Sequence, residues 1–297
     1  MLLQKHTIIS KRFFYIYRLI NLKYINMLTK FKETADFLKS KISIQPEVAI
    51  ILGSGLGGLG DRIKNATAIK YKDIPNFPVS TVEGHSGKLI FGELGGKNVV
   101  AMQGRFHYYE GYNMKEVTFP VRVMHFLGAT KLIVSNAAGG MNPKFQQGDL
   151  MIINDHINHF PEHPLHGKNF KELGVRFPDM SNVYNKEYIN IALELAKDID
   201  INVHQGIYIG SSGPTLETPA EYRLFHLFGA DATGMSTVPE VIVAHHQGMK
   251  IFGMSVITNE SETENPDDKT THEEVQDVAG SVEPKMTQII EGLIARM

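Results

Sequence analysis

The chain has 297 residues, 42% of them hydrophobic and 21% charged, as in a globular protein with one large domain or two small ones. Its net charge of -2 and lack of a basic stripe argue against a nucleic-acid partner, and no apolar run reaches the roughly 20 residues of a membrane span. The absence of cysteine excludes disulfides, thiolate metal sites and cysteine nucleophiles.

The first 26 residues differ in composition from the rest, since they carry basic side chains and no acidic ones. They lack the uninterrupted apolar core and small-residue cleavage site of a secretory signal. Two interpretations are left: a targeting or surface-binding segment, and a start codon assigned too early, with Met27 as the true beginning. We favour the second. We expect residues 1–26 to be poorly ordered and residues 27–297 to form a single domain.

From Pro46 onward, short apolar stretches typical of buried strands alternate with stretches of helical periodicity. This alternation predicts an α/β layered domain with a largely parallel or mixed sheet, whose ligands bind at the loops after the strands. The predicted strands are 47–52, 89–92, 99–103, 131–135, 150–153, 206–210 and 250–258. Helices are predicted over 114–129 and 188–199, and from capping boxes at 218–221 and 271–274.

A glycine-rich loop, Gly53-Ser-Gly-Leu-Gly-Gly58, follows the first strand and fits G-x-G-x-x-G, with Asp73 20 residues after Gly53. This pattern favours a dinucleotide site only weakly. Ser54 places a hydroxyl among free amides, which suits a lone phosphate equally well. A phosphate site, a dinucleotide site and a plain tight turn are all open at this point.

Basic and aromatic side chains gather at the next strand ends. Arg105, His107 and Tyr109 follow one strand, and His85 precedes another. An arginine fork matches phosphate oxygens, and a histidine can donate a further bond or carry a proton. Each residue alone is more often structural, so the indication of an anion site comes from their joint occurrence.

Two further loops follow buried strands. The first, Asn136-Ala-Ala-Gly-Gly-Met-Asn142, is built of small residues that allow a ligand to approach backbone amides, although a crowded sheet edge favours the same residues. The second ends at Glu217, directly before the capping box at Thr218. The Glu217 carboxylate either faces the ligand edge of the sheet or serves as a partner of the helix dipole.

The stretch 231–240 is the most informative one. Gly234, Met235 and Ser236 come just before a helix start in which Thr237 and Glu240 have the spacing of a capping box. A hydroxyl and free amides at a helix N-terminus suit an anion such as phosphate. Met235 offers a soft apolar wall for a sugar or base. This segment therefore predicts phosphate and an organic group held side by side.

Four histidines, His156, His159, His163 and His166, invite a metal interpretation. They lie among prolines, so no regular helix face is available, and their spacing matches no zinc signature. We expect a loop and no metal.

Taken together, these motifs resemble the purine nucleoside phosphorylases of the trimeric type, in the family shared with methylthioadenosine phosphorylase. The resemblance implies a three-layer α/β/α sandwich around a mixed, partly barrel-like sheet. It also implies reversible phosphorolysis of purine nucleosides, including 2′-deoxy forms, in cytoplasmic purine salvage, with phosphate as co-substrate and no cofactor. The matching segments are 53–59, 104–112, 136–142, 213–221, 229–244, 256–259 and 272–275.

The resemblance also implies a role for each candidate residue. Phosphate would be bound by Ser54, His85, Arg105, His107, the amide of Ala137 and Ser236. The ribose would be held by Tyr109, Met235 and His272, and the base by Glu217, Asn259, Leu216 and Thr233. Catalysis would depend on Asn259, Glu217 and His107.

The resemblance implies a homotrimer, because Phe177 would reach into a neighbouring subunit's pocket. The methylthioadenosine branch carries an aspartate where this chain has Asn259, so inosine and guanosine are the expected substrates. Methylthioadenosine phosphorylase activity, a nicotinamide-dependent dehydrogenase and a catalytically silent nucleoside-binding protein are the alternatives.

Overall fold

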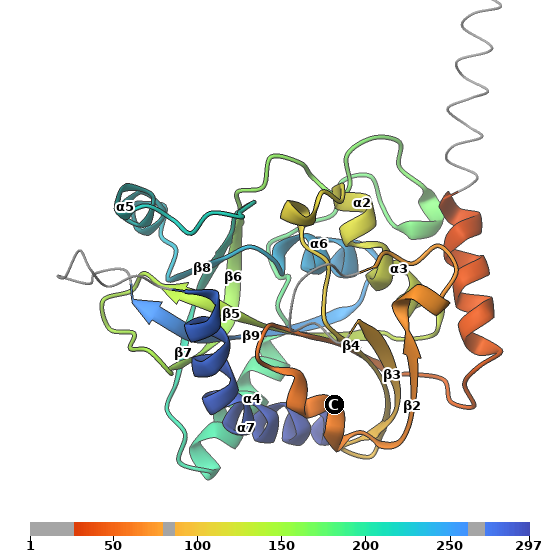
Figure 1. The fold of residues 1–297 in the computed structure, drawn as a ribbon, viewed down its shortest axis with the longest axis horizontal. Coiled ribbons are helices and arrows are strands. Elements are labelled where there is room, and N and C mark those ends of the chain that lie inside the picture. The colour runs from red at the N-terminus through yellow and green to blue at the C-terminus, as the bar shows by residue number, and fades with distance from the viewer. Residues whose placement is uncertain (1–26, 80–86, 261–270) are drawn as a thin grey trace, which may run out of the picture.

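A computed structural model describes residues 27–79, 87–260 and 271–297 of the chain (Figure 1). The expectation of disorder before Met27 and the placement of His85 fall outside these residues. Within them, no helix combines the length and apolarity needed to cross a bilayer.

The described strands form one nine-stranded sheet in the order β2-β3-β4-β1-β5-β8-β7-β6-β9. β3 and β4 form an antiparallel hairpin, and β1 pairs in parallel with β4 and β5. The strands are β1 (Val48–Leu52), β2 (Lys64–Lys70), β3 (Lys88–Leu94), β4 (Lys97–Gln103), β5 (Lys131–Gly140), β6 (Leu150–Asn158), β7 (Val203–Gly210), β8 (Ala232–Gly234) and β9 (Lys250–Glu260).

Part of this sheet closes on itself. β5 pairs in parallel with β9 along its whole length and turns at its end to pair with β8. Because β8, β7, β6 and β9 are each paired with the next, the five strands form a ring. β1, β4, β3 and β2 extend the sheet outward from β5. The prediction of a mixed, partly barrel-like sheet is confirmed.

Helices cover both sides of the sheet, so the three-layer arrangement is also confirmed (Figure 1). α2 (Met114–Val117), α3 (Phe119–Phe126) and α6 (Val238–His246) lie on one side, and α4 (Lys186–Asp198) and α7 (His272–Arg296) on the other. α5 (Pro219–Leu227) stands at the edge. Short 3-10 helices are η1 (Gly57–Arg62), η2 (Tyr71–Asp73), η3 (Tyr108–Glu110) and η4 (Lys171–Leu173).

The predicted helix over 114–129 is wrong as a single element. The structure divides it into α2 and α3 at Thr118, whose φ of -95° and ψ of 1° are not helical. Pro120 lies in the first turn of α3, where its missing N–H leaves no hydrogen bond unmade. The apolar periodicity continues through the break, so periodicity alone did not reveal it.

One helix and two strands were not predicted. Residues 27–39 are helical, and Phe31, Ala35 and Leu38 are buried at helical spacing, with the Phe31 ring 4.9 Å from that of Phe119. β2 is an edge strand whose side chains are nearly all exposed, so it has no hydrophobic alternation to detect. β8 is too short, with three residues, to carry a pattern.

The glycines of the 53–58 loop are explained by packing of the chain on itself. A Cβ on Gly53 would lie 2.8 Å from the backbone of Asn136 in β5. Gly55 has a φ of +72°, and a Cβ there would lie 2.8 Å from the Ala279 side chain in α7. The loop continues into η1, whereas the dinucleotide fingerprint requires an α-helix at that position.

We predict that Gly53→Ala destabilises the protein by about 1–3 kcal/mol, because the added methyl group pushes the loop away from β5. Gly280→Ala in α7 is the matched control, since a Cβ there meets nothing closer than 3.8 Å and alanine favours a helix. Urea unfolding of both variants measures the difference, and equal stabilities would contradict the packing explanation.

Candidate active site

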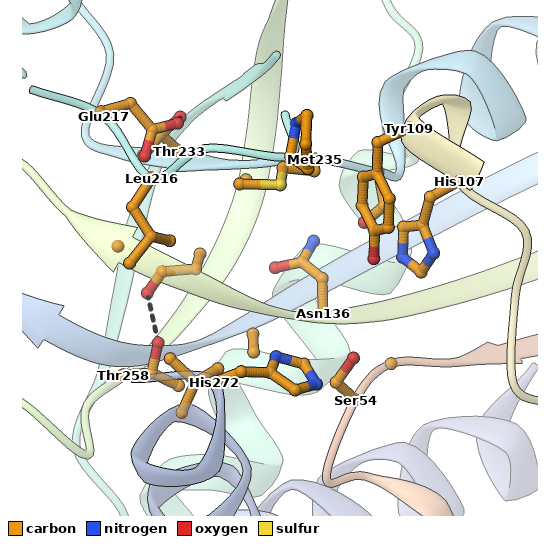
Figure 2. Close-up of a pocket in the computed structure, with 18 of the residues that line it drawn as sticks. Ser54, His107, Tyr109, Asn136, Leu216, Glu217, Thr233, Met235, Thr258 and His272 are labelled. Atoms are coloured by element: carbon orange, nitrogen blue, oxygen red, sulfur yellow. Dashed lines mark hydrogen bonds between the residues drawn. The ribbon is translucent and has the colours of Figure 1, made fainter. Parts of the chain in front are cut away.

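A cavity of about 510 Å³ lies where β5, β8 and β9 end and where the loops after β1, β4 and β7 converge. Figure 2 shows Glu217, Thr233 and Leu216 at one end and Ser54, His107 and Tyr109 at the other, with Met235 and Asn136 between them. The remaining lining residues are Gly53, Arg105, Glu110, Ala137, Ala138, Gly139, Pro214, Tyr222, Gly234, Ser236, Thr258, Asn259, His272 and Val275.

Arg105 supplies a fixed positive charge at one end of the cavity. Its side chain is only 1% exposed. Nη1 donates to Thr237 Oγ1 at 3.1 Å and lies 3.4 Å from Glu240 Oε2, and Nη2 donates to the carbonyl of Ser135 in β5. A buried cation needs such partners, and they fix the guanidinium plane beside the cavity.

His107 is held by Glu110 one turn later. The Glu110 carboxylate accepts from the His107 backbone N–H at 2.7 Å and lies 3.1 Å from Nδ1. The imidazole ring stacks on Tyr109 at 4.7 Å. Burial lowers the pKa of His107 below its usual range, and the hydrogen bond to Glu110 opposes this effect. The Nδ1–H of a neutral His107 ring can donate to the Glu110 carboxylate, which orients the ring.

Thr237 departs from ordinary backbone geometry. Its φ is 71° and its ψ is -57°, and the Val238 N–H donates to the Ser236 carbonyl at 2.8 Å. This combination is a γ-turn of the rare positive-φ form. A β-branched residue in this region costs about 1–3 kcal/mol. The Thr237 N–H donates to Glu240 at 2.6 Å, as the predicted capping box requires. The Thr237 hydroxyl contacts Arg105 and Asn136.

Glu217 lies at the opposite end of the cavity. Thr233 Oγ1 donates to its Oε1 at 2.9 Å, and Ser211 Oγ donates to the same oxygen at 3.2 Å. Both hydroxyls stabilise the ionised carboxylate and hold its orientation. Hydrogen bonds between Thr218 and Glu221 confirm the predicted capping box of α5. This cap fixes the backbone at Thr218, the residue after Glu217.

Asn259 lies on β9 just after a register shift relative to β5. Its Nδ2 donates to the Tyr222 hydroxyl at 3.0 Å, and its Oδ1 accepts from Thr258 Oγ1 at 3.3 Å. These two bonds orient the amide. A Cβ on Gly139 would lie 2.8 Å from the Tyr222 oxygen, so only glycine leaves room for this arrangement.

The middle of the cavity is bounded by apolar and aromatic side chains. A Cβ on Gly213 would lie 2.3 Å from Met235 Sδ and 3.2 Å from the Tyr109 ring, so the loop after β7 packs directly against both. Leu216 is 47% exposed and forms part of the open side. His272, at the start of α7, lies across the cavity from Met235 and contacts Gln276 (Figure 2).

Every described residue predicted for the site lines this cavity except Phe177. Phe177 is 86% exposed and lines a separate hollow with Arg176 and Pro178. The expectation of a loop for the four clustered histidines is wrong for His156, which lies in β6 and contacts the Tyr184 hydroxyl at 3.1 Å. Among the residues that the structure describes, no three His, Asp or Glu side chains gather as metal ligands.

Sequence reasoning missed several lining residues. Asn136 begins the segment predicted as a loop, but residues 136–140 are in fact the end of β5. Thr258 adjoins Asn259, and only the sheet register shows that Asn136 and Thr258 face the cavity. Tyr222 lies one turn inside α5, and nothing in its sequence surroundings distinguishes it from a surface aromatic. Thr237 was identified only as a helix cap.

We predict that Glu110→Gln lowers the pKa of His107 further, because a neutral amide stabilises the imidazolium less than a carboxylate does. NMR titration of the His107 ring measures the change, with His107→Gln assigning the signal. Glu93→Gln, at an exposed position of β3, is the control and leaves the His107 titration unchanged. An unchanged or raised His107 pKa in Glu110→Gln would contradict the assigned contact.

Comparisons with known proteins identify the family of this chain. The sequence profile of the phosphorylase superfamily matches residues 47–295. Purine nucleoside phosphorylase 1 of Geobacillus stearothermophilus is 52% identical over 269 residues, 91% of this chain and 98% of that protein. A structure of the Schistosoma mansoni purine nucleoside phosphorylase with inosine has a TM-score of 0.85 and 41% identity, and covers 91% of this chain and 96% of its own. A structure of that protein with adenosine has a TM-score of 0.85 and 42% identity, and covers 90% of this chain and 96% of its own. The chain therefore belongs to the phosphorylase superfamily, within its family of purine nucleoside phosphorylases.

Proposed function

We propose that a single domain over residues 27–297 catalyses the reversible phosphorolysis of purine nucleosides and their 2′-deoxy forms in cytoplasmic purine salvage. The products are the free base and ribose or deoxyribose 1-phosphate. The observation that carries this proposal is that Arg105 and Glu217 line one cavity, so that an anion and a purine edge can flank one sugar.

Phosphate is assigned to the end that contains Arg105, His107 and Ser236, with Ser54 and the Ala137 amide completing the set. His85 is assigned to the same anion on the family resemblance. The buried guanidinium provides the charge, and hydroxyls and amides provide directed donors. Phosphate oxygen attacks C1′ as the C1′–N9 bond breaks, so no covalent enzyme intermediate is required.

The sugar is assigned to the middle of the cavity, against Tyr109 and Met235, with His272 toward the 5′-hydroxyl. Bond cleavage builds positive charge on the sugar, as in other oxocarbenium-like transition states. The phosphate dianion beneath the ring stabilises this charge. Catalysis is then mainly orientation and electrostatics within a preorganised cavity.

The base is assigned to the end that contains Glu217, Asn259, Thr233 and Leu216. Asn259 faces N7 and O6 and stabilises the negative charge of the departing base. Glu217 accepts from N1–H of a 6-oxopurine, whereas adenine presents an acceptor at N1. These donor and acceptor types favour inosine and guanosine over adenosine.

A homotrimer is the proposed assembly. Phe177 is 86% exposed and the nearby Val175 is 65% exposed, so this segment presents apolar surface that a partner can cover. We infer that Phe177 fills part of a neighbouring subunit's cavity, which makes the complete site dependent on assembly.

We predict that the protein releases hypoxanthine from inosine only when phosphate is present, with ribose 1-phosphate formed in equal amount. Chromatography of both products with and without phosphate measures this. Hypoxanthine release without phosphate would refute phosphorolysis. Inosine binding without turnover would indicate a silent binding protein, and tight NAD binding with no use of phosphate would favour the dehydrogenase.

The same assay tests the choice of base. We expect kcat/KM for inosine to exceed that for adenosine by about 10⁴, because the Glu217 carboxylate would face an acceptor at N1 of adenine in place of a donor. Comparable values would overturn the assigned role of Glu217. Efficient turnover of 5′-methylthioadenosine would favour the methylthioadenosine phosphorylase alternative.

A second prediction concerns Asn259→Ala, which removes a donor to the leaving base. We expect kcat to fall by about 10²–10³, or about 2.7–4 kcal/mol of barrier. Asn190→Ala, at an exposed position of α4, is the control. Steady-state kinetics with inosine decides, and a loss below threefold would remove Asn259 from catalysis.

A third prediction concerns Phe177→Ala. If this side chain completes a neighbour's cavity, KM for inosine rises about tenfold while kcat changes little, because binding area is lost. Leu227→Ala, with a side chain that is 82% exposed on α5, is the control. Sedimentation of the wild type tests the trimer, and a fully active monomer would contradict the assembly.

A further inference from the structure

We propose that Thr237 is a positioning residue that directs the Ser236 hydroxyl and the Arg105 guanidinium toward the anion. The inference rests on the proposed phosphorolysis and assigns a role to a residue so far described as a helix cap. Thr237 is fully buried and does not line the cavity itself. It therefore acts through the residues that it contacts.

The Thr237 hydroxyl has three polar neighbours from three parts of the chain. Oγ1 accepts from Arg105 Nη1 at 3.1 Å, in the loop after β4, and from Asn136 Nδ2 at 2.9 Å, on β5. Ser236 Oγ lies 3.1 Å away at the end of the loop after β8. One hydroxyl thus joins the side chains of three residues that line the cavity.

A count of donors gives the direction of the bond to Ser236. A hydroxyl has one proton to donate and two lone pairs that accept. The N–H groups of Arg105 and Asn136 occupy both lone pairs, so the proton of Thr237 goes to Ser236 Oγ. Ser236 is then an acceptor toward Thr237, so its own proton is directed to another neighbour, the Tyr208 oxygen or an anion in the cavity.

The backbone explains why this hydroxyl reaches all three neighbours. The positive-φ turn at Thr237 places the residue against the start of α6, and Glu240 holds it there by accepting from the Thr237 N–H. Glu240 also lies beside Arg105, so backbone and side chain of Thr237 are tied to the same ion pair. A glycine would adopt this conformation without strain but would carry no hydroxyl.

The test is Thr237→Val, which keeps the β-branched shape and the backbone strain and removes only the hydroxyl. We expect KM for phosphate to rise at least tenfold, while KM for inosine at saturating phosphate changes less than twofold. Thr237→Ser restores the hydroxyl and is expected to keep KM for phosphate within threefold of the wild type. Thr118→Val is the control, because that buried hydroxyl donates only to Met114 C=O.

The outcomes separate a positioning role from a structural one. A folded Thr237→Val protein with an unchanged KM for phosphate overturns the inference, and so does an equal rise in both KM values, which indicates general loosening. If Thr237→Val does not fold, Thr237→Cys carries the same comparison, because a thiol packs well but accepts hydrogen bonds weakly.

Failure of the proposed function gives a different result. In that case wild-type turnover of inosine shows no saturation with phosphate. Calorimetric titration with inorganic phosphate alone adds a readout that needs no turnover. Weaker phosphate binding by Thr237→Val than by Thr237→Ser supports the inference, and equal binding by the two variants overturns it.

Discussion

The buried charge of Arg105 is the constraint on which the rest of the site depends. An arginine that is shielded from water requires a counter-ion and acceptors for its N–H groups, and removal of one partner of such a pair costs about 3–5 kcal/mol. Here the partners come from β5 and from α6, so the cation joins the outer part of the sheet to the closed ring. The Arg105 end of the cavity is therefore part of the core of the protein.

The two ends of the cavity are constructed differently. The end that contains Arg105 is deeply buried, with Arg105 and Thr237 almost inaccessible to solvent. The opposite end depends on side-chain hydroxyls around Glu217 and on the open loop that carries Leu216. A compact, invariant anion suits the first construction, and bases that differ in their substituents suit the second. In the proposed assignment, recognition of the common reactant is therefore separate from discrimination among the variable ones.

The sequence predicted the layered fold and most of the cavity because the informative residues follow buried strands. The ends of such strands and the side-chain types after them can both be recognised from the sequence. It did not reveal β2 or β8, which lack a hydrophobic pattern, and it missed the helix break at Thr118 because apolar spacing runs through it. Tyr222 and Thr237 act through contacts between distant segments, and such contacts leave no local signal. The prediction of Thr237 as a helix cap was correct for its backbone N–H, which donates to Glu240. It did not predict the contact of the Thr237 hydroxyl with Arg105.

The register shift between β5 and β9 has a consequence for how such a cavity changes over time. Ile257 faces Ala138, but Asn259 faces Gly139, so Thr258 is an extra residue that resets the alternation of the strand. A gain or loss of one residue between Lys250 and Thr258 would turn Asn259 to the opposite face of the sheet. Strand length is thus far less free to vary than side-chain identity. During evolution of this fold, we expect new substrate preferences to arise by exchange of side chains at fixed strand positions. Insertions are expected to accumulate in the outer loops.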